Sequence, residues 1–161
     1  MNQIATPPWQ MSVDLPSVQD TERYAAYLAT CLTVPMVITL SGEIGAGKTT
    51  LMRALLRALG VQGPIKSPTY SLVETYDLPP NPALSESLVQ VHHFDLYRMT
   101  DESELEFLGF RDYFQSNTIC CIEWPERIRL PAEQIDLALL LIGSGNDRTL
   151  SILSANEFPV F

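Results

Sequence analysis

Residues Leu40–Thr50 read LSGEIGAGKTT and contain the pattern Gly-x4-Gly-Lys-Thr between Gly42 and Thr49. Glycines allow the backbone to curl so that successive N–H groups face an anion such as a polyphosphate. In such a loop Lys48 supplies a positive charge for the terminal phosphates, and the Thr49 hydroxyl can bind Mg²⁺. The stretch therefore predicts a phosphate-binding loop, known as a P-loop.

The flanking segments supply the setting that a P-loop requires. Met36–Leu40 is a short apolar run typical of a buried β-strand. After the loop, apolar residues recur at helical spacing through TTLMRALLRALG, residues 49–60, and Gly60 is placed to end that helix. A strand, a glycine loop and a helix are thus expected in the required order.

The rest of the chain is predicted to form further strands and helices. A helix is expected from Ser17, a suitable N-cap residue, to about Leu32, and a short helix is expected before Gly109. Strands are expected at Met11–Leu15, Ser71–Tyr76, Leu88–Phe94 and Thr118–Ile122, with a hairpin built from Ile135–Ile142 and Arg148–Leu153. The 161 residues are interpreted as a loose lead-in over residues 1–10 and a single domain over residues 11–161.

Two carboxylates follow predicted strands and are candidates for the second half of a nucleotide site. Asp95 ends the strand in HHFDLYR, and Glu123 follows the run that ends at Ile122. Ligands of open α/β sheets bind at the carboxyl ends of the strands, where a P-loop also emerges. Each carboxylate can therefore hold Mg²⁺ or orient an attacking water, or can simply pair with a neighbour such as Arg98 or Arg127.

Other polar residues leave two interpretations open. Thr69 in SPTY lies about twenty residues beyond the P-loop, where a loop that senses the γ-phosphate belongs, but a plain proline turn fits as well. Trp124 fits a position beside the nucleotide or one in the core. His92 and His93 are expected on opposite faces of a strand, and Lys66 is expected to be a solvated charge.

The composition limits the possible partners. The net charge is −9, from 10 Lys and Arg against 19 Asp and Glu, whereas nucleic-acid binding needs clustered basic residues. Contact with RNA is therefore expected only through a partner. The cysteines Cys31, Cys120 and Cys121 lack metal-binding spacing, and the adjacent pair is expected to be buried. No signal peptide or membrane-spanning pattern is seen, so we expect a cytoplasmic protein that does not bind membranes.

The motifs GEIGAGKTT, SPTYSLVE, HHFDLYR, ESELEFLGFRDYF and IEWPE occur in this order. With them the chain resembles the TsaE (YjeE) family, bacterial P-loop ATPases of tRNA threonylcarbamoyladenosine (t6A) biosynthesis, over roughly Pro16–Leu153. The resemblance implies an α/β fold of the P-loop NTPase-like, three-layer kind with a mostly parallel central sheet. Two departures are Ser17, where the family commonly has an acidic residue, and a longer, proline-rich connection at Leu78–Leu88.

The resemblance also implies a site for ATP and Mg²⁺. The nucleotide contacts that it implies are Gly45, Ala46, Gly47, Lys48, Thr49, Thr50, Thr69 and Arg148. Thr49, Asp95 and Glu123 would surround Mg²⁺. The catalytic groups would be Lys48, Asp95 and Glu123.

Function through partners is implied as well. Members of the family work with the TsaB–TsaD protein pair, in which TsaD modifies adenosine 37 of ANN-decoding tRNAs, and their ATPase activity is weak without partners. Two alternatives remain open on the sequence: a small-metabolite P-loop kinase, and a nucleotide-gated scaffold without catalysis. A GTPase is disfavoured because the chain lacks an Asn-Lys-x-Asp element.

Overall fold

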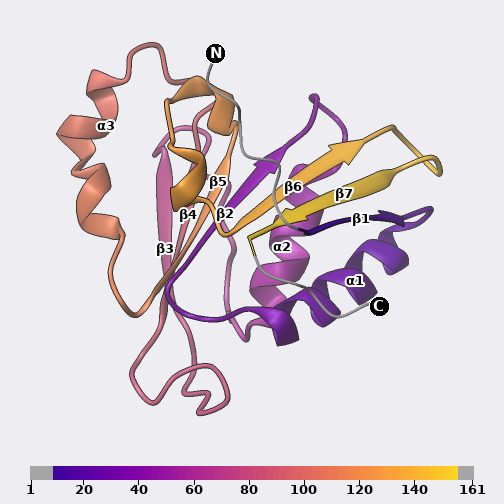
Figure 1. Ribbon diagram of the computed structural model, residues 1–161, viewed down its shortest axis with the longest axis horizontal. Helices are drawn as coiled ribbons and strands as arrows, with labels where there is room; N and C mark the ends of the chain where they lie inside the picture. The colour runs from indigo at the N-terminus through magenta and orange to yellow at the C-terminus, as the bar shows by residue number, and fades with distance from the viewer. Residues whose placement is uncertain (1–8, 156–161) are drawn as a thin grey trace.

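A computed structural model describes residues 9–155 of the chain (Figure 1). The strands are β1 (Trp9–Asp14), β2 (Met36–Ser41), β3 (Val73–Asp77), β4 (Gln90–Asp95), β5 (Thr118–Glu123), β6 (Leu137–Ile142) and β7 (Thr149–Ser154). The α-helices are α1 (Val18–Cys31), α2 (Lys48–Ala58) and α3 (Ser103–Leu108), and the short 3₁₀ helices are η1 (Phe110–Tyr113), η2 (Pro125–Arg127) and η3 (Ala132–Gln134).

All seven strands form one sheet in the order β1-β7-β6-β2-β5-β4-β3. The four central strands, β6, β2, β5 and β4, are mutually parallel, whereas β3, β7 and β1 pair antiparallel at the two sides. Because β2, β4 and β5 run in the same direction, their carboxyl ends meet at one edge of the sheet. This arrangement confirms the predicted α/β class with a parallel central sheet.

The sheet is covered on both faces by separate clusters of buried side chains. One cluster joins α1 and α2 to strand residues such as Ile38 and Ile119. The other joins α3 and η1 to the opposite strand face, for example at Phe94 and Ile122. In Figure 1, α1 and α2 lie together beside β7 and β1, while α3 stands apart next to β3. The molecule therefore has the expected three layers.

The helix boundaries follow from local chemistry. The Ser17 hydroxyl accepts a hydrogen bond from the main-chain N–H of Asp20, so Ser17 is the N-cap of α1, as predicted. Gly109 adopts φ of 74° and ends α3. These signals lie within a few residues of the helix ends and were readable from the sequence.

Two segments differ from the expectation. Residues 1–8 of the expected lead-in lie outside the described residues, and β1 begins at Trp9 because Trp9 and Gln10 pair with β7. The connection at Leu78–Leu88 is mostly exposed, but it is anchored at its base. There the buried Leu78 donates a main-chain hydrogen bond of 2.9 Å to Val89.

Candidate nucleotide site

The P-loop joins the end of β2 to the first turn of α2. Gly47 is the N-cap of α2, with φ of 106° in the left-handed region that favours glycine. Gly42 has φ of 152°, and a methyl group on it would lie 2.6 Å from the main-chain oxygen of Leu141 on β6. None of the described side chains forms a capping hydrogen bond at the start of α2, so its first N–H groups are available to an anion.

Lys48 is held within the loop. Its side chain is buried, and its Nζ donates hydrogen bonds to the main-chain oxygens of Gly42 and Glu43, the latter at 2.9 Å. Nζ also lies 4.4 Å from the centre of the Trp124 ring, a cation–π distance. Phosphate oxygens would offer Lys48 charge-assisted bonds in place of these neutral partners.

A pocket of about 400 Å³ opens beside the P-loop. Its lining residues are Ile44, Gly45, Gly47, Lys48, Thr49, Thr50, Thr69, Asp95, Tyr97, Glu123, Trp124 and Arg148. The pocket thus brings together every predicted site residue except Ala46. The Ala46 side chain is buried in the core, and its N–H is bonded to the main-chain oxygen of Glu43 at 3.1 Å. Pockets of this size suit small-molecule ligands.

Arg148 reaches the pocket from the start of β7. A methyl group on Gly47 would lie 3.3 Å from Arg148 Nε, so the arginine side chain packs directly against the P-loop. Its Nε is buried and has no hydrogen-bond partner among the described residues. Arg148 and Lys48 therefore place two cationic side chains at one pocket.

The two predicted carboxylates lie side by side at the ends of parallel strands. Asp95 on β4 and Glu123 on β5 are paired in register, and both are buried. The Thr69 hydroxyl donates a long hydrogen bond of 3.5 Å to Asp95 Oδ2, while Asp95 Oδ1 accepts one of 3.0 Å from the N–H of Tyr97. The turn that carries Thr69 thus reaches the strand-end carboxylates, and its role in sensing a ligand stays a prediction.

Burial shifts the pKa of Asp95. Removal from water raises the pKa of its carboxyl above the ordinary value, and the Glu123 carboxylate nearby raises it further. Hydrogen bonds from the Tyr97 N–H and the Thr69 hydroxyl partly oppose this rise. A cation bound between the two carboxylates would relieve the same penalty.

The donor set fits Mg²⁺ when a nucleotide is bound. Within residues 9–155, no group of three or more His, Cys, Asp or Glu side chains is placed to hold a metal ion. Mg²⁺ commonly takes only one or two carboxylates and completes its shell with water and phosphate oxygens. Thr49, Asp95 and Glu123 provide that kind of partial set, and Glu123 Oε1 is buried without a partner among the described residues.

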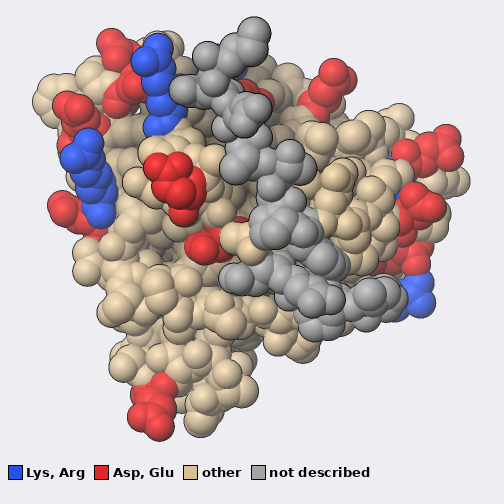
Figure 2. Space-filling model, viewed as in Figure 1, with Lys and Arg blue, Asp and Glu red and all other residues tan. Residues whose placement is uncertain are grey.

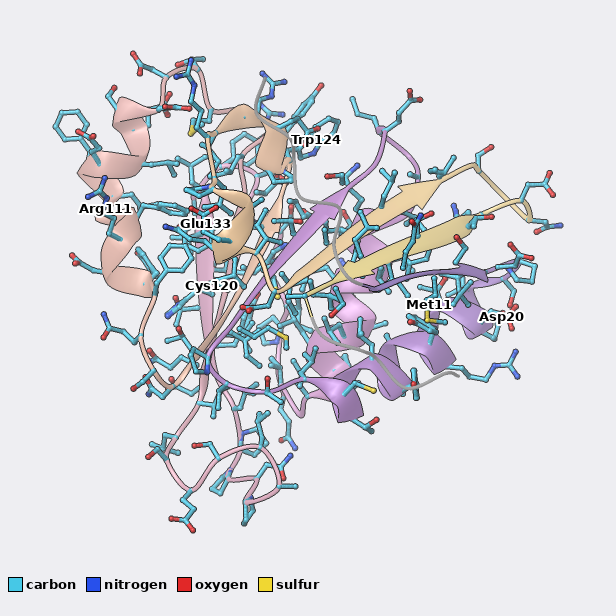
Figure 3. The ribbon with its side chains drawn as sticks, in the orientation of Figure 1. Met11, Asp20, Arg111, Cys120, Trp124 and Glu133 are labelled. Carbon is cyan, nitrogen blue, oxygen red and sulfur yellow. The ribbon has the colours of Figure 1, made fainter. Side chains whose placement is uncertain are left out.

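Two aromatic residues, Trp124 and Tyr97, also line the pocket. Trp124 has φ of 57°, an unusual value for a residue with a side chain, and its ring lies 4.9 Å from that of Tyr97 (Figure 3 labels Trp124 at the end of the sheet). Trp124 lines the pocket and also packs against the buried cluster around Phe94, so its place beside a nucleotide stays a prediction. Tyr97 also lines the pocket but was not predicted, because a tyrosine just beyond a strand has no distinctive pattern.

The remaining predicted polar residues take the positions expected of them. His92 and His93 occupy opposite faces of β4: His92 contacts Thr75 and Tyr113, whereas His93 lies near Glu123. Cys120 and Cys121 are buried, and burial raises the pKa of the Cys120 thiol to about 12. Both cysteines therefore behave as small apolar residues.

None of the helices within residues 9–155 is long and apolar enough to cross a membrane.

A solved structure supports the fold. The crystal structure of Bacillus subtilis YdiB superposes with a TM-score of 0.66 and covers 92% of this chain and 87% of that one, at 22% sequence identity. At that identity the likeness concerns the fold alone.

Curated relatives are similar to this chain in sequence. A protein of Haemophilus influenzae named tRNA threonylcarbamoyladenosine biosynthesis protein TsaE is 49% identical over 92 residues, which are 57% of this chain and 53% of the relative. That match thus spans about half of the relative's length. A Synechocystis protein of the same name is 36% identical over 76% of each chain. The family model for threonylcarbamoyl adenosine biosynthesis protein TsaE matches residues 15–149, and the chain therefore belongs to the TsaE family.

Proposed function

We propose that this protein binds ATP with Mg²⁺ in the P-loop pocket and hydrolyses it slowly, as part of tRNA threonylcarbamoyladenosine biosynthesis. The observation that carries the proposal is the convergence of Lys48, Thr69, Asp95 and Glu123 on one pocket beside the P-loop. Membership of the TsaE family supports the pathway.

The side chains suggest how the reaction would proceed. Lys48 would leave the main-chain oxygens of Gly42 and Glu43 and bind the terminal phosphates. Bound Mg²⁺, held by Thr49, Asp95 and Glu123, would neutralise phosphate charge. Glu123 or Asp95 would orient a water for in-line attack, so that a new P–O bond forms as the bond between the γ-phosphorus and the bridging oxygen breaks.

Partners are expected to complete the function. Among the described residues, Lys48 and Arg148 are the cationic side chains that line the pocket, and Arg148 lies against Gly47. Charge stabilisation supplied by a partner often accelerates such reactions strongly, so turnover by the chain alone should be slow.

The surface charge suggests what those partners are. The net charge of −9 favours protein partners over direct binding of nucleic acid, and Figure 2 shows more Asp and Glu than Lys and Arg on the displayed face. We propose the TsaB–TsaD pair as these partners, with tRNA contacted through them, in the cytoplasm.

The test is ATP hydrolysis by the purified chain, with and without the cognate TsaB–TsaD pair. We expect low activity that rises with the pair, vanishes in Lys48→Ala and is unchanged in Arg23→Ala, a control that removes an exposed positive charge on α1. An ATPase rate that does not change when the TsaB–TsaD pair is added would refute partner-driven turnover. Phosphate transfer to a small molecule would instead identify a metabolite kinase.

A further variant distinguishes a function that requires ATP hydrolysis from one that requires only ATP binding. Glu123→Gln should bind ATP but hydrolyse it at least 10-fold more slowly if Glu123 orients the water or the metal. If this variant still supports t6A formation by the TsaB–TsaD pair at the full rate, nucleotide binding alone is sufficient and the protein is a nucleotide-gated scaffold.

A further inference from the structure

His93 is a buried polar residue that the proposed reaction does not use. Its side chain is only 5% exposed, and neither ring nitrogen has a hydrogen-bond partner among the described residues. Buried polar groups in folded proteins are almost always paired, directly or through water. An imidazole left without a partner beside a candidate active site therefore calls for an explanation.

The nearest charged group to His93 is Glu123. His93 Nε2 lies 3.4 Å from Glu123 Oε2, and the Glu123 side chain is 4% exposed. The two atoms are close enough to interact but do not form a hydrogen bond. In the sheet His93 is in register with Cys121, which precedes Glu123 by two residues on β5. His93 and Glu123 therefore lie on the same face of the sheet, the face that α2 covers. Glu123 thus approaches His93 and also lines the nucleotide pocket.

A second, very small cavity lies on another side of His93. Its volume of about 10 Å³ is close to the space needed by one water molecule. It is lined by Thr49, Arg53, Ile65, Lys66, Ser67 and His93. All of these residues except Ile65 have polar side chains, so a bound water there would find hydrogen-bond partners.

We propose that His93 is a positioning residue that fixes the Glu123 carboxylate. In this arrangement the Nε2–H of His93 donates to Glu123 Oε2, and Nδ1 accepts a hydrogen bond from one water in the small cavity. A glutamate side chain has several rotatable bonds, and a buried donor behind it selects one orientation before any ligand arrives. The consequence for ATP hydrolysis rests on the proposed function, whereas the contact and the water do not.

The first test is a high-resolution crystal structure of the nucleotide-free protein. We expect His93 Nε2 within hydrogen-bond distance of Glu123, and a water within hydrogen-bond distance of Nδ1. A Glu123 carboxylate turned away from His93, or a small cavity without water, would overturn the proposal. This measurement needs neither a variant nor enzymatic activity.

Variants then test whether His93 sets the orientation. In His93→Leu, which keeps the bulk but removes the donor, Glu123 should change its conformation or occupy more than one. In His93→Gln, whose amide can replace the Nε2 donor, Glu123 should stay in place. The matched control is His92→Gln, because His92 lies on the opposite face of β4 and bonds to Thr75. The same single Glu123 conformation in His93→Leu as in the wild type would refute the proposal.

Kinetics connect the contact to hydrolysis. In His93→Leu we expect kcat to fall about 10- to 100-fold, as for loss of a hydrogen bond to a charged group, with little change in KM for ATP. His93→Gln should recover most of the rate, and His93→Leu should have no further effect in a Glu123→Ala background. If His93→Leu lowers kcat by the same factor in the Glu123→Ala variant as in the wild type, His93 does not act through Glu123. If the wild type lacks ATPase activity, the proposed function fails, and the crystal structures still decide the role of His93.

Discussion

Replacing Gly42 with alanine should distort the P-loop, because the added methyl group would come too close to the backbone of β6. The new methyl group would lie 2.6 Å from the main-chain oxygen of Leu141, whereas ordinary contacts begin at 3.4 Å. The shortfall of about 0.8 Å cannot be relieved by a side-chain rotation, since the obstructing atom belongs to the backbone of β6. The loop must therefore move away from the sheet or distort β6.

The magnitude follows from two costs. A residue with a side chain held at an unfavourable positive φ costs about 1–3 kcal/mol, and overpacking costs a further 1–3 kcal/mol or so. We therefore expect Gly42→Ala to lower the free energy of unfolding by about 2–6 kcal/mol, which corresponds to a fall in Tm of roughly 4–24 °C. Nucleotide binding should weaken as well, because the displaced loop no longer presents its N–H groups together.

Urea unfolding of Gly42→Ala and Gly45→Ala separates these costs. Gly45 also has a positive φ, of 81°, but none of the described atoms lies within 4 Å of a methyl group placed there. Gly45→Ala should therefore show only the conformational cost, about 1–2 kcal/mol. Equal losses in the two variants would refute the argument that close approach to Leu141 makes glycine necessary at residue 42.

Three further predictions concern single groups. If ATP phosphates bind Lys48 as proposed, Lys48 would move away from the Trp124 ring, and ATP should change the fluorescence of a variant that keeps Trp124 as its sole tryptophan. A fluorescence signal that ATP leaves unchanged would contradict this prediction. Burial lowers the pKa of His92, so its neutral form is favoured in the folded protein and stability is lost as pH falls through the ordinary value of 6.5. In urea unfolding, the free energy of unfolding should therefore fall less between about pH 7 and 5 for His92→Gln than for the wild type. An equal fall in the two proteins would contradict the argument that burial lowers the pKa of His92. Cys120 and Cys121 are buried with raised thiol pKa values, so a thiol reagent should label at most the third cysteine in the folded protein and all three in urea; rapid labelling of the buried pair would show that β5 opens.

Much of the fold was predictable because its signals are local. The glycine pattern, the apolar strand before it and the helical spacing after it all lie within one segment, and their prediction is confirmed by β2 and α2. Ser17 was recognised as an N-cap from its own neighbourhood. The start of β1 at Trp9 was missed because it depends on pairing with β7, at the other end of the chain.

The candidate site was predictable only in part. Asp95 and Glu123 could be placed at one sheet edge because each follows a predicted strand, and the structure pairs them in register. Tyr97 was missed, since a tyrosine just beyond a strand has no distinctive pattern. That the roles of these residues concern ATP and Mg²⁺ remains a proposal.

The sequence alone was sufficient for the P-loop, the order of the elements and the family resemblance, because each depends on residues close together or on motifs in order. The contacts that would control the chemistry required the folded chain. Lys48 meets Trp124, Gly42 meets the backbone of Leu141, and His93 approaches Glu123. Each of these contacts joins different strands or loops, and its distance depends on strand register and side-chain packing, which a local pattern does not encode.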